Sequence, residues 1–446
     1  MEHSREISND LVKEVIKVRR YLHKYPEISE KEYNTCKYIR NYLNNIGINN
    51  KVIGETGVVG ILIRDEDLPT VAIRAEIDAL PINEENTFEY KSKNNGVMHA
   101  CSHDGITAVV LGLAKLLSEN KDKLNCNVKF IFEPAEEVGK GAKKLIEEKV
   151  LEDPKVDNMI IFHFANSDTI GMEIQKHIST ATIGRVSINI LGKSSHWGDA
   201  KEGIDAISIS GKVLNIIDKM IIFHFANSDT IGMEIQKDIS TATIGRVSIN
   251  ILGKSSHWGD AKEGIDAISI SGKVLNIIDK MNNSLKDKGP FILGIGMING
   301  GVKNNIMADS VRLEGTLIAV GDDKFNYLLN YLKEKMKILS EESGAKIEVN
   351  LESKLPSVVN DYNLVQIGRK IGEDIFKERF VLGEKVYLAG DNAAYYFQKT
   401  PGIRMVFFAK KENEINYPLH NSKFDFNEDI FYYALSTIYQ MILSIR

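Results

Sequence analysis

The sequence is poor in cysteine, proline and tryptophan. Its 446 residues include three cysteines, nine prolines and two tryptophans. So few cysteines in a chain of this length exclude a fold held together by disulfides, and we expect the protein to work in the reducing cytoplasm. No run of consecutive apolar residues approaches about 18, the length that a membrane-spanning helix needs, so we expect no membrane span.

An excess of positive charge is also lacking. The formal net charge is −5, and lysine and arginine form no continuous run. We therefore expect neither nucleic acid nor an anionic membrane as a partner. The first residues, MEHSREISNDLVKEV, are polar and amphipathic and lack the apolar core of a signal peptide. Hydrophobic residues make up 43% and charged residues 26% of the chain, as is typical of globular proteins.

A long tandem duplication lies in the middle of the chain. Residues 159–219 recur as residues 220–280, a repeat of 61 residues in which only His177 is replaced, by Asp238. Solenoid proteins contain about three or more units, and those units diverge in sequence. Two nearly identical long units instead indicate a duplication within a fold that needs the segment only once.

The first part of the chain alternates between apolar runs and helical patterns. Leu11, Val15 and Leu22 recur at helical spacing within the first 30 residues. Short apolar runs then alternate with helical patterns, the runs at 58–63, 70–78, 128–134 and 159–164, the helices near 104–118 and 140–149. This alternation predicts an α/β domain with a mixed, largely parallel sheet, whose functional groups gather at the carboxyl ends of the strands.

The pattern changes after about residue 181. With one copy of the repeat, the strands and helices up to about residue 357 follow the order βαββαβ, which is the ferredoxin-like arrangement. The α/β pattern returns from about residue 358. We therefore expect residues 1–180 and 358–446 to form one domain, into which residues 181–357, with the surplus copy, insert a second.

Two motifs after expected strands offer metal-binding or acid–base groups. GVMHACSHDG (96–105) contains Cys101 and His103 in a Cys-x-His spacing, with His99 and Asp104 alongside. Such a pair alone is more typical of an ordinary buried thiol. FEPAEE (132–137) ends in two adjacent carboxylates, Glu136 and Glu137. Such pairs usually lie on solvated helix surfaces, but this pair directly follows an apolar strand and a proline.

Two further motifs, at or just after expected strands, each contain a histidine. MIIFHF puts His163, or His224 in the second copy, inside an apolar strand, where a hydrogen-bonded core histidine is the common case. NYPLHNSKFDF (416–426) puts His420 in a polar loop. Together the four motifs offer one thiolate, three imidazoles and two carboxylates, a set that suits Zn²⁺, Mn²⁺, Co²⁺ or Ni²⁺.

The chain resembles the metal-dependent amidohydrolase family that includes hippurate hydrolase, plant auxin-conjugate hydrolases and N-acetyldiaminopimelate deacetylase. The resemblance covers essentially the whole chain once one copy of the repeat is removed. The motifs that carry it are LHKYPEIS (22–29), AIRAEIDALPI (72–82), GVMHACSHDG (96–105), FEPAEE (132–137), GKSSHWG in both copies, INGGVKNNI (298–306) and PLHNSKFDFNED (418–429).

The resemblance implies a centre of two divalent metal ions, with Mn²⁺, Zn²⁺, Co²⁺ and Ni²⁺ as candidates. The implied metal ligands are Cys101, His103, Glu137, His163 (or His224 in its place) and His420. It also implies that Glu136 is the general base and that Asp78 orients the metal ligands. The implied reaction is hydrolysis of the amide bond of an N-acyl amino acid or small peptide-like substrate, as in aminoacylases, deacetylases and carboxypeptidases.

The resemblance also assigns a role to the inserted domain, as a lid through which the chain forms a homodimer. The histidine of GKSSHWG, His196 or His257, would reach the scissile carbonyl, in this family often from the partner subunit. Asn305 would assist it. The duplication leaves open which copy is used at each place.

Two arrangements of the copies are conceivable. In one, copy 1 supplies the catalytic strand with His163, copy 2 supplies the lid with His257, and the crossover falls near residues 177–181. In the other, the whole second copy bulges out after the lid helix, and His196 stays in place. Loop-closure entropy rises only slowly with loop length, so both are thermodynamically possible.

Several residues depart from the family pattern. They are Glu76 in place of aspartate, Ser102 in place of glycine, Ile106 in place of a second histidine, Ile318 near an expected arginine, and Asp391, Asn392 and Ala393 in place of Glu-Asp-Phe. Because that arginine would hold a substrate carboxylate, its absence weakens the case for a free carboxylate on the substrate. The departures favour altered specificity over lost catalysis. The alternative is a catalytically inactive relative that binds metal or ligand, or that the duplication misassembles.

Overall fold

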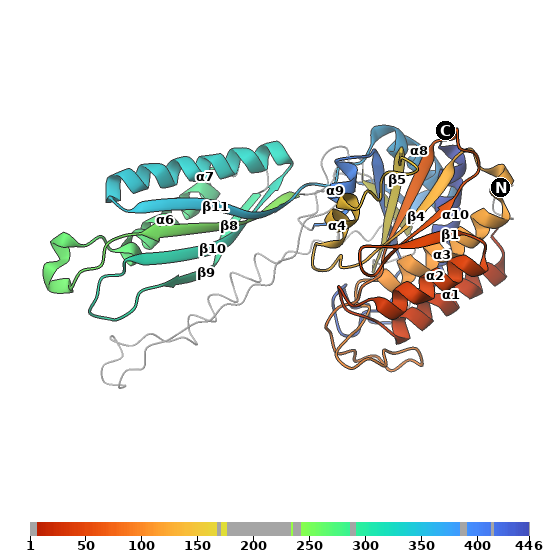
Figure 1. Ribbon diagram of the computed structural model, residues 1–446, viewed down its shortest axis with the longest axis horizontal. Coiled ribbons are helices and arrows are strands. Elements are labelled where there is room, and N and C mark those ends of the chain that lie inside the picture. Colours follow the sequence, from red (N-terminus) through yellow and green to blue (C-terminus); the bar gives the residue numbers. More distant parts are fainter. Residues whose placement is uncertain are drawn as a thin grey trace.

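The structure, a computed structural model, describes residues 7–166, 171–175, 233–234, 242–285, 291–383, 390–411 and 414–445. These residues form a larger domain that contains both ends of the described chain and a smaller, elongated domain beside it (Figure 1). The larger domain is made from residues before 235 and after 355, so the smaller domain is an insertion into it.

A nine-stranded mixed sheet forms the centre of the larger domain. Its strands, in spatial order, are β1 (Asn49–Ile53), β2 (Gly57–Leu62), β4 (Asn127–Glu133), β3 (Thr70–Glu76), β5 (Asn158–Ala165), β13 (Gly402–Phe408), β6 (Gly171–Gln175), β12 (Phe380–Gly383) and β7 (Met233–Glu234). The four central strands β4, β3, β5 and β13 are parallel, and β2 and β6 on either side are antiparallel to them. The expectation of an α/β domain with a mixed sheet is confirmed.

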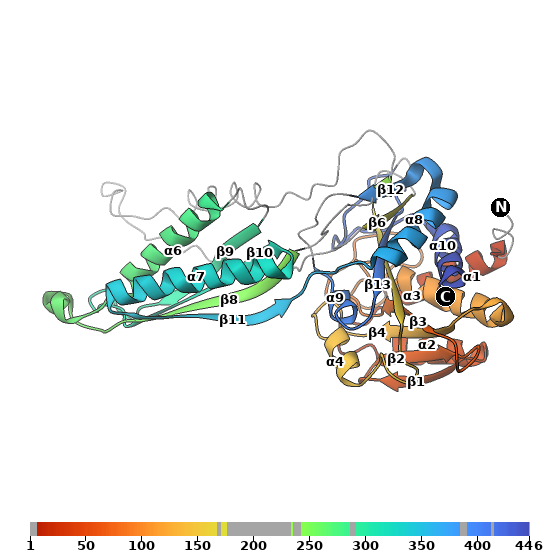
Figure 2. The same cartoon turned by 90° about the horizontal axis from the view of Figure 1, so that it is seen from above.

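Helices cover both faces of this sheet (Figures 1 and 2). One face carries α1 (Asn9–Lys24), α2 (Tyr33–Asn45), α3 (His103–Glu119), α8 (Tyr362–Phe376) and α10 (Ile430–Ser444), and the other carries α4 (Gly141–Glu147) and α9 (Ala393–Phe397). Two 3₁₀ turns, η2 (Lys121–Lys123) and η6 (Lys377–Arg379), follow α3 and α8. No helix in the described ranges combines the length and the apolar composition that crossing a membrane requires.

The sequence explains the two helices that lie nearest the centre. α1 begins after Ser8, whose side chain accepts a hydrogen bond from the backbone N–H of Leu11 (3.1 Å), and it buries one apolar stripe. α3 is buried on all sides, because it lies between the sheet and the helices α1 and α10. A helix that is apolar all round suits this position, and its first residue, His103, lies at the carboxyl edge of the parallel strands.

The smaller domain is a four-stranded antiparallel sheet with two helices on one face (Figure 2). Its elements are β8 (Ala242–Leu252), η4 (Trp258–Glu263), α6 (Ala267–Ser284), β9 (Phe291–Gly300), β10 (Ser310–Val320), α7 (Asp322–Ser343) and β11 (Lys346–Leu355). Along the chain, these strands and the two α-helices follow the order βαββαβ. In the sheet, the strand order is β11-β8-β10-β9. Apolar residues of alternate strand positions and of the inner helix faces, such as Val247, Val274 and Phe325, form its core.

The two copies of the repeat contribute to different parts of the fold. Copy 1 supplies β5 and β6 next to β13, and copy 2 supplies β7 at the edge of the same sheet and then β8 and α6 of the smaller domain. The described elements thus place β5 in copy 1, and β8 and α6 of the smaller domain in copy 2, whereas the crossover expected near residues 177–181 lies outside the described residues. The expected domain boundary at residue 181 lies outside the described residues, as do His196 and His224.

α3 and α1 approach each other closely at Gly112. A Cβ atom on Gly112 would lie 2.3 Å from Cγ2 of Val15, whereas a Cβ atom on Gly272 of α6 would meet no atom within 4 Å. The first site has no room for a side chain unless α1 moves, and the second has ample room.

We expect Gly112→Ala to lower the free energy of unfolding by about 1–3 kcal/mol, because the β-branched Val15 has little rotamer freedom to move aside. The matched variant Gly272→Ala should be neutral or stabilise by up to about 1 kcal/mol, because alanine is the better helix former. Urea unfolding followed by circular dichroism compares the two. Equal destabilisation by both variants would contradict the close approach of α1 and α3.

Candidate metal centre

Cys101 and His103 flank a sharp turn that leads into α3. Ser102, between them, has φ 62°, and its hydroxyl donates to the carbonyl oxygen of Phe164 on β5 (3.2 Å). This left-handed conformation favours glycine, so the hydrogen bond helps to hold serine in it. The turn is thereby fixed against β5, and Cys101 and His103 lie beside His163 of that strand.

Three other segments bring side chains to this turn. Glu137 follows β4, His163 lies near the end of β5, and His420 lies in the loop after β13. Cys101 Sγ is 3.6 Å from His163 Nε2 and 3.2 Å from His420 Nε2. The Glu137 carboxylate oxygens lie 3.9 Å from His103 Nε2 and 3.9 Å from His420 Nε2. The structure therefore brings together all five residues that the resemblance implies as metal ligands.

The five side chains form two overlapping groups that could each hold a metal ion. One group is Cys101, His103 and His163, and the other is Cys101, Glu137 and His420. Within each group the candidate ligand atoms lie within 4.8 Å of one another. Cys101 belongs to both groups, so the two candidate groups share the thiol.

Hydrogen bonds orient both buried histidines of the centre. His103 Nδ1 donates to the carbonyl oxygen of Asp78 (2.9 Å), and His163 Nδ1 donates to the carbonyl oxygen of Phe164 (2.8 Å). Because Nδ1 donates in both rings, the neutral form of each ring has its lone pair on Nε2, on the side of the cluster. Asp78 Oδ2 also accepts from the backbone N–H of Glu137 (3.0 Å). Asp78 therefore holds two segments that carry candidate ligands. Residues that surround the ligands of a metal site commonly orient them in this way.

Burial shifts the pKa values of four candidate ligands toward their neutral forms, whereas Cys101 and Asp78 outweigh burial at His103 and raise its pKa well above its usual range. Burial and the neighbouring Glu137 raise the pKa of the Cys101 thiol. Burial raises the pKa of Glu137 to about 7, although the charge of His103 acts against it. Burial also lowers the pKa of both His163 and His420. A bound divalent cation would reverse the shifts of the thiol and the carboxyl, because it stabilises their ionised forms.

The residues fit a metal centre on chemical grounds as well. Glu137 Oε1 is buried and has no hydrogen-bond partner, which costs free energy unless a cation or donor meets it. The donor set of one thiolate, three imidazoles and one carboxylate suits Zn²⁺, Mn²⁺, Co²⁺ and Ni²⁺.

Glu136 reaches the same centre from beside Glu137. One candidate ligand atom each from Glu136, Glu137 and His103 lies within 4.8 Å of the others. Burial and the charge of Glu137 raise the pKa of Glu136 well above its usual range. A carboxyl group in this position is suited to take up and hold a proton.

A buried arginine near these carboxylates, Arg74, was not predicted from the sequence as a residue of the site. Arg74 of β3 donates from Nε to Glu133 (2.7 Å) and from Nη2 to Asn392 (2.5 Å), and it pairs with Glu76 and Asp391. Glu133 ends β4 just before the two site glutamates, so Arg74 ties that strand end to β3 and to residues 391–392. The signal was a single arginine inside the otherwise apolar strand TVAIRAE.

The predicted residues of the inserted domain lie together but away from the metal centre. His257 precedes η4, its Nδ1 accepts from the backbone N–H of Gly259 (3.2 Å), and its backbone pairs with Ile306, the neighbour of Asn305. η4 lies at the end of the smaller domain that points away from the larger domain (Figures 1 and 2). His257 and Asn305 are therefore not part of the centre within one chain.

Comparison with known proteins places this architecture in a family. The model of peptidase family M20/M25/M40 matches residues 72–444. Thermostable carboxypeptidase 1 of Saccharolobus solfataricus is 31% identical, over 93% of this chain and 91% of that protein. N-acetyl-L-cysteine deacetylase of Bacillus subtilis is 28% identical, over 92% of this chain and 83% of that protein.

A solved structure has the same fold. It is a dinuclear metal binding peptidase of the M20 family from Bacillus subtilis, with a TM-score of 0.72 and 24% sequence identity, and the match covers 98% of this chain and 99% of the other. The family resemblance read from the sequence motifs is confirmed. The chain belongs to peptidase family M20/M25/M40.

Proposed function

We propose that the protein is a metal-dependent amidohydrolase that cleaves the amide bond of an N-acyl amino acid or a small peptide-like substrate. The observation that carries this proposal is the convergence of Cys101, His103, Glu137, His163 and His420 on one buried centre, with Glu136 beside it. The deacetylase and carboxypeptidase among the relatives act on substrates of this class by name.

Each group of ligands would hold one divalent ion, with Mn²⁺, Zn²⁺, Co²⁺ and Ni²⁺ as candidates. His103 and His163 would hold one ion, Glu137 and His420 the other, and the Cys101 thiolate would be shared. Bound there, the ions would lower the pKa of a water molecule and polarise the scissile carbonyl.

Glu136 would move the proton in the reaction. Its carboxylate takes a proton from the attacking water and returns it to the nitrogen of the departing amine, so that one residue acts first as base and then as acid. Burial and the charge of Glu137 raise the pKa of Glu136. The raised pKa would help Glu136 to keep the proton between these two steps. The Arg74 cluster holds the end of β4 and thereby the segment that carries Glu136.

A second subunit would complete the site. His257 and Asn305 lie together at the end of the smaller domain, on the side away from their own metal centre. We therefore infer that the smaller domain is a lid that forms a homodimer and offers His257 to the carbonyl of the partner's substrate. The described cysteines are all free, which supports a cytoplasmic location.

Purified protein should contain up to two divalent ions per chain, and it should release product from members of a panel of N-acetyl and N-benzoyl amino acids and dipeptides. Removal of metal with a chelator should abolish the activity, and Mn²⁺, Zn²⁺ or Co²⁺ should restore it. Metal analysis and a ninhydrin assay measure the two properties. Far less than one ion per chain, or no release from any substrate with metal supplied, would refute the proposed function.

We expect Glu136→Gln to lower kcat by about 10²–10⁴-fold, the usual contribution of a general base, because glutamine cannot accept the proton. The variant should keep its metal content, because the five ligands are untouched. Steady-state kinetics with metal analysis of the same samples tests this. Glu148→Gln, on the surface of the same domain, serves as the control. Activity within a few-fold of the unmodified protein would remove Glu136 from the mechanism.

The duplication provides a matched pair of variants. His163 lies against Cys101, and His224 is its counterpart in the second copy, within the same local sequence. We expect His163→Ala to lower metal affinity by at least tenfold, because one ligand group loses an imidazole. His224→Ala should leave metal affinity unchanged. Isothermal titration of metal into the two metal-free variants distinguishes them, and the opposite result would assign the catalytic strand to the second copy.

A further inference from the structure

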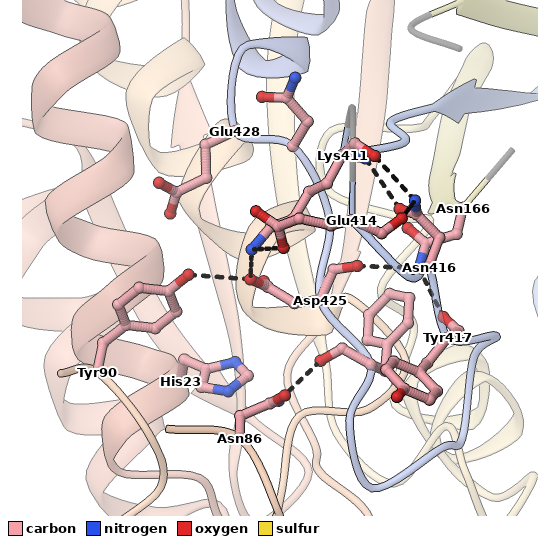
Figure 3. Close-up of polar contacts among 12 residues, drawn as sticks. His23, Asn86, Tyr90, Asn166, Lys411, Glu414, Asn416, Tyr417, Asp425 and Glu428 are labelled. Carbon is pink, nitrogen blue, oxygen red and sulfur yellow. Dashed lines mark hydrogen bonds and ion pairs between the residues drawn. The ribbon is translucent and has the colours of Figure 1, made fainter. Parts of the chain in front are cut away.

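The loop that carries His420 contains one residue with an unusual number of buried polar contacts. Asp425 Oδ1 accepts from Arg19 Nη2 (2.6 Å), and Oδ2 accepts from the hydroxyl of Tyr90 (3.0 Å) and from Lys411 Nζ (2.5 Å). Its carbonyl oxygen accepts from Asn166 Nδ2 (2.9 Å). Figure 3 shows Tyr90, Lys411 and Asn166 directed at Asp425 from three different segments.

Arg19 extends this network to the metal centre. Its side chain is fully buried, and each of its nitrogens meets a different carboxylate: Nη2 that of Asp425, Nε that of Asp104 (2.8 Å), and Nη1 that of Glu428 (3.1 Å). Asp104 directly follows the ligand His103 at the start of α3. One guanidinium group therefore joins the turn that carries Cys101 and His103 to the loop that carries His420.

Asp104 is itself held by a second buried cation. His23 Nδ1 lies 2.8 Å from Asp104 Oδ2, and His23 Nε2 lies 3.1 Å from Glu84 Oε1. An ionised carboxylate can only accept, so both ring nitrogens carry protons and His23 is a cation. Four cations thus face four carboxylates in the cluster: Arg19, Arg20, His23 and Lys411 against Glu84, Asp104, Asp425 and Glu428.

The His420 loop is also held by the core, because Phe424 and Phe426, on either side of Asp425, are fully buried. Asn166, which directly follows β5 and its His163, donates to the carbonyl oxygens of both Tyr417 (2.6 Å) and Asp425 (2.9 Å), on either side of His420. The backbone N–H of His420 donates to the carbonyl oxygen of Ala100 (2.7 Å). These buried rings and hydrogen bonds together fix the position of the loop.

We propose that Asp425 is a positioning residue for the metal centre. Its carboxylate, held by Arg19, Tyr90 and Lys411, sets the position of the loop and therefore the distance between His420 and the Cys101 thiolate. This inference rests on the proposed function, because it presumes that His420 and Cys101 bind metal. Asp425 belongs to none of the candidate ligand groups, and it would act only through the loop.

The test is the variant Asp425→Asn, which keeps the size and the shape of the side chain and removes its charge. Arg19 and Lys411 then lose a charged partner, and the loop loses its fixed position. We expect the affinity of the metal-free protein for Mn²⁺ or Co²⁺ to fall by about 10–100-fold, the usual effect of changing an outer residue of a metal site. The thiolate-to-Co²⁺ charge-transfer band of the Co²⁺-loaded protein should shift or weaken.

Glu14→Gln is the matched control. Glu14 also accepts from a tyrosine and a lysine, Tyr42 (2.7 Å) and Lys115 (2.7 Å), but no metal-centre residue contacts it. The variant Glu14→Gln should therefore leave the metal affinity and the Co²⁺ spectrum unchanged. Thermal melting of the metal-free proteins measures the loss of stability in both variants. If Asp425→Asn is destabilised but keeps its metal affinity within twofold and its spectrum unchanged, its role is structural only and the proposal is wrong.

Tyr90→Phe covers the case in which Asp425→Asn does not fold. It removes one hydrogen bond to Asp425 and leaves every charge of the cluster in place. We expect a smaller loss of metal affinity in the same direction, and an unchanged affinity would contradict the proposal. If the unmodified protein binds no metal, the proposed function fails instead, so the two failures are distinguishable.

Discussion

The candidate site depends on the parallel pairing of β4, β3 and β5. Because the strands are parallel and adjacent, the residues that follow β3 and β4 meet the end of β5 at one edge of the sheet. Asp78, the glutamates at 136–137 and His163 are far apart in sequence and come together only there. A shift of one residue in the register of either pair would turn His163 or its neighbours to the opposite face. The register of these strands is therefore the first requirement of the site.

Buried charge is the second requirement. Arg74 holds the ends of β3 and β4 to residues 391–392, and Arg19 holds the start of α3 to the loop of residues 417–428. Buried ion pairs contribute little net stability, because desolvation offsets their attraction. Their effect here is geometric, since each guanidinium group fixes several segments at hydrogen-bonding distance. The two arginines thus define where the segments that carry the site residues lie relative to one another.

The two copies of the repeat supply different elements of the described fold. Copy 1 occupies the β5 position between β3 and β13, copy 2 supplies β8 and α6, and the short β7 covers the free edge of β12. Relatives near 30% identity match more than nine-tenths of the chain, so the rest of the sequence still specifies the same architecture. A long insertion of this kind is tolerated because the entropic cost of closing a loop grows slowly with its length.

The sequence by itself determined the family, the α/β class and the identity of the residues that meet at the centre, because these depend on local motifs and on the period of apolar residues. Cys101, His103, Glu136, Glu137 and His420 could all be named from motif and order alone. Only the tertiary structure decided that His163 of the first copy lies against Cys101, because the two copies are identical around this residue and the sequence offers no reason to prefer one. The partners of Arg19, Arg74 and Asp425 could not be predicted either. The arginine inside TVAIRAE indicates a buried charge, but its partner Asn392 lies hundreds of residues away, as Asp425 does from Arg19.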